Sequence, residues 1–210
     1  MPLIRRGSSP DAAPVSRPDL DAAGAALRAG SPQDRWAAAR ALATIPGAAS
    51  VLGRALAAED DEGVREAIFT SLARIGGDEG LEAVLPYLRG DDANLRTGAL
   101  DALRLMRGAA IGRLEALLHD ADVDVRILAC DLARDVAPAE ASTLLSAVIE
   151  TDLEINVCAA AVDVLAEVGS PEVLPALARC AARFADQPFL AFAVRVASDR
   201  IGVSADGPHG

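Results

Sequence analysis

The chain of 210 residues contains no lysine, and all 20 of its basic residues are arginines. The absence of lysine excludes a lysine Schiff base and a phosphate-binding loop that ends in lysine. Aromatic residues make up only 3% of the sequence, and the two histidines are His119 and His209. Two distant histidines do not suit a histidine-based metal site. We therefore expect neither a metal nor another cofactor.

Cysteine is also rare: Cys130, Cys158 and Cys180 are odd in number, widely spaced and set among apolar neighbours. This usage predicts buried, reduced thiols rather than a disulfide framework or a zinc site, and thus a cytoplasmic protein. No run approaches the roughly 20 apolar residues that cross a bilayer. Near the N-terminus, Arg5 and Arg6 are followed by Ser and Pro, where a signal peptide has its apolar segment. No membrane partner is expected.

The chain is acidic, with 31 Asp and Glu residues and a net charge of −11. Nucleic-acid binding needs a basic stripe, and this balance argues against it. What the sequence has in abundance is alanine, with 46 residues, and leucine, with 26. Both are strong helix formers, and they point to helices that pack closely through small side chains. The composition predicts an all-α protein.

A five-residue motif recurs about every thirty residues. Its fifth residue falls at positions 35, 65, 96, 126 and 158, in steps of 30, 31, 30 and 32 residues. Three copies read Asp-x-x-Val/Leu-Arg, the copy ending at Arg35 is weaker, and the copy ending at Cys158 has lost its arginine. Small or apolar residues stand three and seven positions after each fifth residue. Because these positions share one face of a helix, the motif opens an amphipathic helix.

Each repeat unit divides into two predicted helices. The acidic residue that opens the motif can cap the first helix, and a Gly or Pro ends it. A second helix follows, with its own apolar stripe. A lone pair of helices cannot bury both stripes, whereas stacked pairs can. We therefore predict a right-handed α-solenoid of about five helix pairs, at residues 31–59, 60–90, 91–120, 121–151 and 152–184.

The two ends of the chain differ from the repeats, as terminal units do. Residues 1–18 contain four prolines and are expected to be flexible, as is the tail at residues 202–210. Between them, residues 19–201 form the predicted solenoid domain, with capping helices at residues 19–29 and 186–200.

Two aromatic features of these ends have alternative interpretations. Phe184, Phe189 and Phe192 lie within nine residues near the C-terminus and are expected to cap the stack by sealing its last apolar face; the alternative is that they form a docking or dimerisation surface. Trp36 is expected to pack under the N-terminal helix, or else to mark an exposed contact.

The motif resembles the HEAT repeat family, especially the short bacterial repeats also found in phycobilisome-lyase-like proteins. The resemblance rests on the Asp-x-x-Val/Leu-Arg motif, the small residue and the Leu that follow it, and the closing Gly, and it covers about residues 30–184. It implies a scaffold whose second helices line the concave side. Some relatives are hydroxylases that bind iron through His-Glu pairs, and this chain has no such pair. HEAT-like DNA glycosylases need a basic concave surface with aromatic residues, and that pattern is missing too.

The acidic and basic residues of the three clear copies form a regular row: Asp61, Arg65, Asp92, Arg96, Asp122 and Arg126. By the same resemblance, such residues cap first helices and link successive units, so we expect a structural ladder rather than a charged surface for a partner. At Cys158 the arginine link is lost. There we expect the stack to bend or slide, between the fourth and fifth units.

The sequence predicts a non-catalytic protein, because neither histidine has a convincing Ser or Cys partner for nucleophilic chemistry. The candidate partner contacts are polar or large residues of the second helices that fall off the apolar stripe: Arg54, Glu82, Tyr87, Arg113, Ser146, Arg179 and Arg183. Tyr and Arg are enriched at protein interfaces. We therefore expect a scaffold or adaptor that binds a protein or peptide, of unknown identity, on the concave face.

Two further expectations rest on the family resemblance alone. One is a regulatory role in bacterial signalling or complex assembly. The other is an alternative function, that of an accessory bilin lyase or chaperone that cradles a tetrapyrrole.

Overall fold

The computed structural model describes residues 19–205, and this part of the chain is helical throughout apart from short connections. It contains twelve α-helices and three 3-10 helices, and no strand occurs within the described range. The N-terminal segment 1–18 and the last five residues, which were expected to be flexible, lie outside the described residues.

Each of the five predicted units contains one pair of helices. The first helices of the pairs are α2 (Pro32–Leu42), α4 (Glu62–Ile75), α6 (Ala93–Leu105), α8 (Val123–Leu132) and α10 (Ile155–Val168). The second helices are α3 (Ala49–Leu56), α5 (Gly77–Val84), α7 (Arg107–Leu118), α9 (Pro138–Thr151) and α11 (Leu174–Arg183). The helices α1 (Leu20–Ala29) and α12 (Pro188–Ala205) lie at the two ends, and the 3-10 helices are η1 (Leu85–Arg89), η2 (Ala133–Asp135) and η3 (Pro171–Val173).

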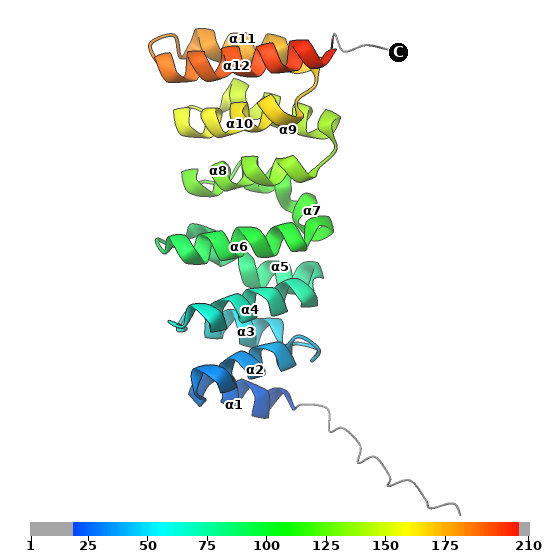
Figure 1. Ribbon diagram of the computed structural model, residues 1–210, viewed down its shortest axis with the longest axis vertical. Coiled ribbons are helices and arrows are strands. Elements are labelled where there is room, and N and C mark those ends of the chain that lie inside the picture. Colours follow the sequence, from blue (N-terminus) through cyan, green and yellow to red (C-terminus); the bar gives the residue numbers. More distant parts are fainter. Residues whose placement is uncertain (1–18, 206–210) are drawn as a thin grey trace, which may run out of the picture.

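The pairs stack in chain order into a column (Figure 1). The first helices form the front layer of this view and the second helices form the layer behind them, with α1 and α12 at opposite ends of the column. Successive first helices pack on one another, and most successive second helices do the same. The predicted all-α solenoid is therefore confirmed.

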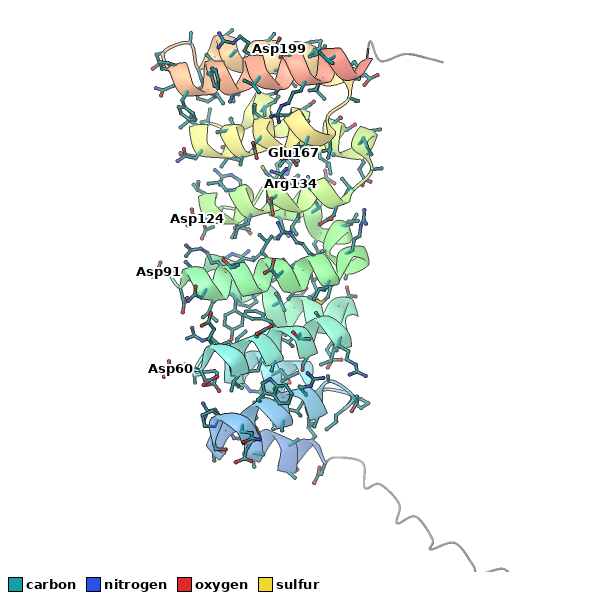
Figure 2. The ribbon with its side chains drawn as sticks, viewed as in Figure 1. Asp60, Asp91, Asp124, Arg134, Glu167 and Asp199 are labelled. Carbon is teal, nitrogen blue, oxygen red and sulfur yellow. The ribbon has the colours of Figure 1, made fainter. Side chains whose placement is uncertain are left out.

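Side-chain caps explain where the first helices begin. The backbone N–H of Val64 donates to the carboxylate of Asp61 at 3.0 Å, and Asp92 and Asp122 accept equivalent bonds at the starts of α6 and α8. Such caps satisfy N–H groups that have no partner within the helix. In Figure 2, Asp60, Asp91 and Asp124 accordingly mark one edge of the column, where these helices begin.

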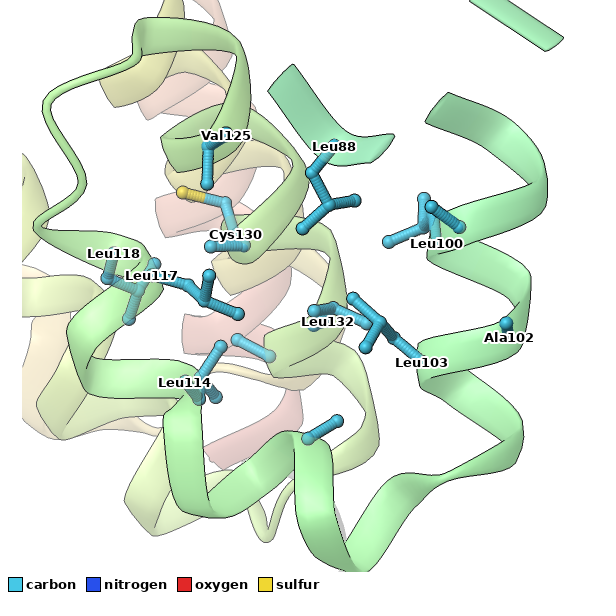
Figure 3. Close-up of a cluster of buried hydrophobic side chains, with 14 of the residues drawn as sticks. Leu88, Leu100, Ala102, Leu103, Leu114, Leu117, Leu118, Val125, Cys130 and Leu132 are labelled. Atoms are coloured by element: carbon cyan, nitrogen blue, oxygen red, sulfur yellow. The ribbon is translucent and has the colours of Figure 1, made fainter. Parts of the chain in front are cut away.

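The core is continuous along the column and is built from the periodic positions of the motif. The residues three positions after each fifth residue are buried, and so are those seven positions after it: Ala38, Ile68, Ala99, Ala129, Ala161, Leu42, Leu72, Leu103, Ala133 and Leu165. Figure 3 shows one section, where Leu88 of η1 points toward Leu103 of α6 and Leu132 of α8. The residues at these two positions, mostly alanine and leucine, thus join neighbouring units in one hydrophobic core.

The second helix of the second unit is shorter than the sequence suggested. Leu85 and Leu88 have the spacing that would continue its apolar stripe, but α5 ends at Val84 and both residues lie in η1. Pro86 lacks the backbone N–H that an α-helix needs at this point, which explains the change to a 3-10 helix. Leu88 is nevertheless buried, because η1 is inserted between α6 and α8 and contacts both.

The C-terminal cap has a different buried face from the expected one. The residues of α12 that pack inward are Leu190, Val194, Ala197 and Ile201. Phe189 and Phe192 are 51% and 58% exposed, so the expectation that they seal the last apolar face was wrong. At about 100° per residue, Phe189 lies beside the buried stripe and Phe192 lies on nearly the opposite face of the helix. The helix also continues to Ala205, into the segment expected to be a flexible tail.

Trp36 does not pack under the N-terminal helix. Its side chain is 42% exposed, and the guanidinium carbon of Arg40 lies 4.7 Å from its ring centroid. Leu27 of α1 is buried instead, and it makes the apolar contact with the first unit.

The junction of the fourth and fifth units, where we expected a bend or a slide, is not loosened: α8 and α10 pack about as closely as α2 with α4 or α4 with α6. The loosest contact between successive first helices is that of α6 with α8, in the third and fourth units. The insertion of η1 between these two helices accounts for the difference.

Candidate protein-binding face

The ladder arginines, and Arg35 at the same position of the first unit, bind the loop that precedes their own first helix, and most of them also bind the unit that follows. Each donates to a backbone carbonyl five or six residues earlier: Arg35 to Gly30, Arg65 to Glu59, Arg96 to Gly90 and Arg126 to Asp120. Three of them also bind an acid that precedes the next first helix, namely Glu59, Asp92 and Asp152, at 2.8, 3.1 and 2.7 Å respectively. The aspartate that opens the motif caps the first helix, and the arginine that closes it makes the contacts just described. One short motif therefore supplies a helix cap and a link between units.

The ladder is interrupted at Arg96. Its side chain donates to the carbonyl of Gly90 at 2.6 Å, but within the described residues it forms no ion pair. The acid of the next unit, Asp120, is bound by Arg89 of η1 instead. This interruption lies at the same place as the loose α6–α8 contact.

A second charged row, on the first helices, was missed by the sequence analysis. Arg134 of η2 binds Asp131 of the same unit, and Asp163 and Glu167 of α10 in the next unit. Figure 2 shows Arg134 and Glu167 facing each other between α8 and α10. Several carboxylates around one guanidinium raise the pKa of Arg134, and they outweigh the cost of its partial burial. The i,i+3 spacing of Asp131 and Arg134 was the available signal.

Five of the seven candidate contact residues are engaged within the solenoid. Arg113 of α7 binds Glu82 of α5 at 2.6 Å, and Arg179 of α11 binds Glu150 of α9. Arg183 donates to three backbone carbonyls that precede α10, those of Ile149, Glu150 and Asp152. Each of these contacts connects neighbouring second helices or their loops.

Tyr87 is the fifth engaged residue. Its hydroxyl donates to the carbonyl of Gly53 in α3, and its ring packs edge-on against Phe69 with the ring centroids 6.1 Å apart. Burial raises the pKa of the Tyr87 hydroxyl. Arg54 and Ser146 are the two candidates that form no hydrogen bond or ion pair with any described residue.

The structure brings three of the candidates together at one groove. Arg54, Glu82 and Tyr87 line an open groove of ≈ 880 Å³ between α3 and α5, on the second-helix face. The other lining residues are Ser50, Gly53, Ala57, Asp78, Glu79, Ala83 and Pro86. Arg113 touches this group through Glu82, whereas Ser146, Arg179 and Arg183 lie on α9 and α11, farther along the column.

Close helix packing forms the floor of the groove. A Cβ atom on Gly53 would lie 3.3 Å from the Cβ atom of Ala83, so the absence of a side chain brings α3 close to α5. Small residues at this contact leave the floor smooth, and the longer charged side chains stand at its rim. An extended chain fits such a surface.

The three cysteines are free thiols, and all are buried. Burial raises the pKa of Cys130 to about 12, which leaves it protonated at neutral pH. Hydrogen bonding between Cys158 and Cys180 raises the pKa of Cys158 and lowers that of Cys180 to about 7, but neither thiol is accessible. Within residues 19–203, no group of three or more His, Cys, Asp or Glu side chains is arranged to hold a metal ion. Among the described helices, none is both long and apolar enough to cross a membrane.

Comparison with known families identifies the repeat. HEAT repeats match residues 20–104 and 112–194, which is most of the chain. The chain belongs to the HEAT repeat family. The unmatched residues between the two segments, 105–111, join α6 to the start of α7. No curated protein matches the sequence.

Solved structures share the repeat fold at low sequence identity. A computationally designed armadillo repeat protein for modular peptide recognition is 19% identical, with a TM-score of 0.44 over 87% of this chain and 99% of its own. Cex1p is 14% identical, with a TM-score of 0.51 over 84% of this chain and 41% of its own. The CpcE–CpcF complex of phycocyanin lyase from Nostoc sp. PCC7120 contains a chain that is 16% identical, with a TM-score of 0.38 over 95% and 100%. The similarity to Cex1p concerns the fold alone.

Proposed function

We propose that this protein is a non-catalytic scaffold that binds an extended segment of a partner protein on its second-helix face, in the groove between α3 and α5. The observation that carries the proposal is the composition of this groove. It combines a floor of Gly53, Ala57 and Ala83 with an amphipathic aromatic residue, Tyr87, and a charged rim. A concave surface of small apolar residues with a few placed polar groups is typical of binding sites.

The remainder of the face is less suited to contact with a partner. Glu82 and Arg113 neutralise each other, and Arg179 and Arg183 are held by Glu150 and by loop carbonyls. A partner that bound these residues would have to break contacts that join units. Arg54 forms no hydrogen bond or ion pair with a described residue, so its charge is available to a partner at the groove.

The chemistry of the chain supports a non-catalytic role. The buried thiols are inaccessible, and Tyr87 donates its hydroxyl proton to a backbone carbonyl. Free cysteines of this kind also suit a reducing compartment, and we place the protein in the cytoplasm. In that compartment it would serve as an adaptor in signalling or in complex assembly.

A selection experiment tests the groove directly. A phage-displayed library of random peptides would be panned on the immobilised full chain, and selected peptides would be measured by fluorescence anisotropy. Ala57→Arg places a long side chain in the groove, and we expect it to weaken binding of the selected peptides by tenfold or more. Ala37→Arg, at an exposed position of α2 outside the groove, is the matched control and is expected to leave binding unchanged.

Two results would contradict the proposal. If Ala57→Arg and Ala37→Arg bind the selected peptides as the wild type does, the groove is not the binding site. If added bilin gives the purified protein a stable visible absorbance band while no peptide is selected, the protein cradles a tetrapyrrole instead.

A further inference from the structure

We infer that the partner segment presents a carboxylate to a second hollow, which adjoins the groove. This inference rests on the proposed function and adds the chemistry of the partner. The hollow has a volume of ≈ 500 Å³ and lies between α1, α2 and α3, with Arg28 and Arg54 in its wall. Arg54 lines both the hollow and the α3–α5 groove, so the two depressions adjoin at this side chain.

The argument begins from how the arginines of this chain are used. Of its 20 arginines, 17 lie between residues 19 and 203, because Arg5, Arg6 and Arg17 precede that range. Among those 17, all but three contact an acid, a backbone carbonyl, an aromatic ring or another described group; the exceptions are Arg28, Arg54 and Arg74. Two of these three uncommitted arginines line the same hollow.

Two of the other charges of the hollow, those of Arg35 and Glu59, bind each other. Arg35 binds Glu59 through two hydrogen bonds of 2.8 Å, and Glu59 also accepts the backbone N–H groups of Asp60 and Asp61. The guanidinium of Arg35 holds the pKa of Glu59 below its usual range, so this pair is an internal salt bridge at neutral pH. Asp60 points to solvent, 3.9 Å from Arg65.

Besides this pair and the exposed carboxylate of Asp60, the hollow presents two guanidinium groups, those of Arg28 and Arg54, above an apolar floor. Leu27, Val51 and Ala55 form this floor. A carboxylate matches a guanidinium fork through two parallel hydrogen bonds, and such charge-assisted bonds are the strong ones. In a chain with a net charge of −11, a local pair of uncommitted cations is a specific site for an anion rather than part of a general basic surface.

The opposite rim of the groove has the opposite charge. Asp78 and Glu79 stand in the first turn of α5, both are exposed, and neither forms an ion pair with a described residue. The surface therefore runs from positive at Arg28 and Arg54, over a floor of small residues, to negative at Asp78 and Glu79. A peptide that carries an acidic residue, then small residues, then a basic residue complements this order of charges.

A series of synthetic peptides tests this order. Fluorescein-labelled peptides would carry one Asp and one Arg separated by two to six alanines, in both orders along the chain, and each would be titrated with the full-length protein at low salt. We expect at least one peptide to bind, and its Asp-to-Asn analogue to bind about tenfold more weakly, which corresponds to about 1.4 kcal/mol. The double variant Arg28→Ala/Arg54→Ala is expected to bind the Asp and Asn peptides equally.

Arg74→Ala is the matched control, because Arg74 is the third uncommitted arginine and lies on α4, away from the hollow. It is expected to keep the preference for Asp. The inference is overturned if no peptide of the series binds, if the Asn analogue binds wild type equally well, or if the double variant keeps the preference. In each of these cases the proposed function still stands if Ala57→Arg weakens the binding of the library peptides. If Ala57→Arg leaves that binding unchanged, the proposed function and the inference both fail.

Discussion

Arg183 of α11 donates to the backbone carbonyl that an arginine at the position of Cys158 would bind. In the third and fourth units, the ladder arginines Arg96 and Arg126 donate to a carbonyl six residues earlier. In the fifth unit that carbonyl belongs to Asp152, and it accepts a hydrogen bond of 2.6 Å from Arg183. The guanidinium of Arg183 also lies 3.3 Å from the sulfur of Cys158, so it occupies the space next to the replaced side chain.

Arg183→Ala should therefore destabilise the junction of the fourth and fifth units. The variant loses the hydrogen bonds to the carbonyls of Ile149, Glu150 and Asp152. We expect a cost of about 1–2 kcal/mol, in the lower part of the range for hydrogen bonds from charged groups, because Arg183 is exposed. Hydrogen exchange of the loop before α10 should speed up, and the thermal midpoint should fall by a few degrees.

A matched control and a rescue make this prediction specific. Arg74→Ala removes an exposed arginine with no described partner, and it should leave both measurements within about 0.5 kcal/mol of wild type. Cys158→Arg restores the motif, and it should be tolerated better in the Arg183→Ala background than in wild type, where two guanidinium groups would compete for one carbonyl. Equal costs in the two backgrounds would show that Arg183 does not replace the ladder arginine.

The fold was predictable from the sequence because its signal is local and repeated. Ala99 and Leu103, for example, are buried for the same geometric reason as Ile68 and Leu72 one unit earlier. The role of Arg183 was not predictable in this way, since it lies 25 residues after Cys158 and belongs to another helix. Compensation between distant positions leaves no mark on the repeat.

The interrupted ladder predicts unequal effects for two arginines with the same place in the motif. Arg126 and Asp152 form a two-bond ion pair whose side chains are 14% and 10% exposed, whereas Arg96 makes one bond to a carbonyl. Arg126→Ala should cost about 2 kcal/mol, and Arg96→Ala about 1 kcal/mol or less. Thermal denaturation followed by circular dichroism compares the two, and equal shifts would contradict the interruption.

The candidate site was only partly predictable. Arg54, Glu82 and Tyr87 were placed on one face from helical spacing, and the structure brings all three to one groove. Spacing could not show that Glu82 is neutralised by Arg113, because pairing between units depends on the offset of successive helices. For the same reason, the hollow at Arg28 was missed: α1 has no place in the repeat, so no periodic argument reaches it.

Stability should depend on pH through Glu59. The hydrogen bonds from Arg35 lower the pKa of Glu59 in the folded protein, whereas the pKa of a glutamate in an unfolded chain is about 4.3. A carboxyl with a depressed pKa contributes stability that is present above the unfolded value and lost as pH falls through the folded value. The wild type should therefore lose stability as the pH falls below about 4.3.

Glu59→Gln separates this contribution from those of other acids. The pKa values of Asp34 and Asp92 are also lowered, chiefly by hydrogen bonds from Ser31 and from the backbone of Leu95, so some pH dependence will remain in the variant. Denaturation midpoints measured between pH 3 and pH 7 should show a variant that is less stable at neutral pH and declines less steeply in acid. A parallel decline in both proteins would show that Glu59 titrates normally.

Replacement of two helical glycines by alanine should change the stability of the protein in opposite directions. In α6, a Cβ atom on Gly98 would lie 2.5 Å from the ring of Phe69, which is buried and packs edge-on against Tyr87. The ring has to move, and overpacking of this kind costs about 1–3 kcal/mol, more than the gain in helix propensity. Gly112 lies within α7 with open space where its Cβ atom would point, so Gly112→Ala should stabilise the protein by about 0.5–1 kcal/mol. Thermal midpoints of the two variants should lie on either side of the wild-type value, and destabilisation by Gly112→Ala would contradict the open environment of that position.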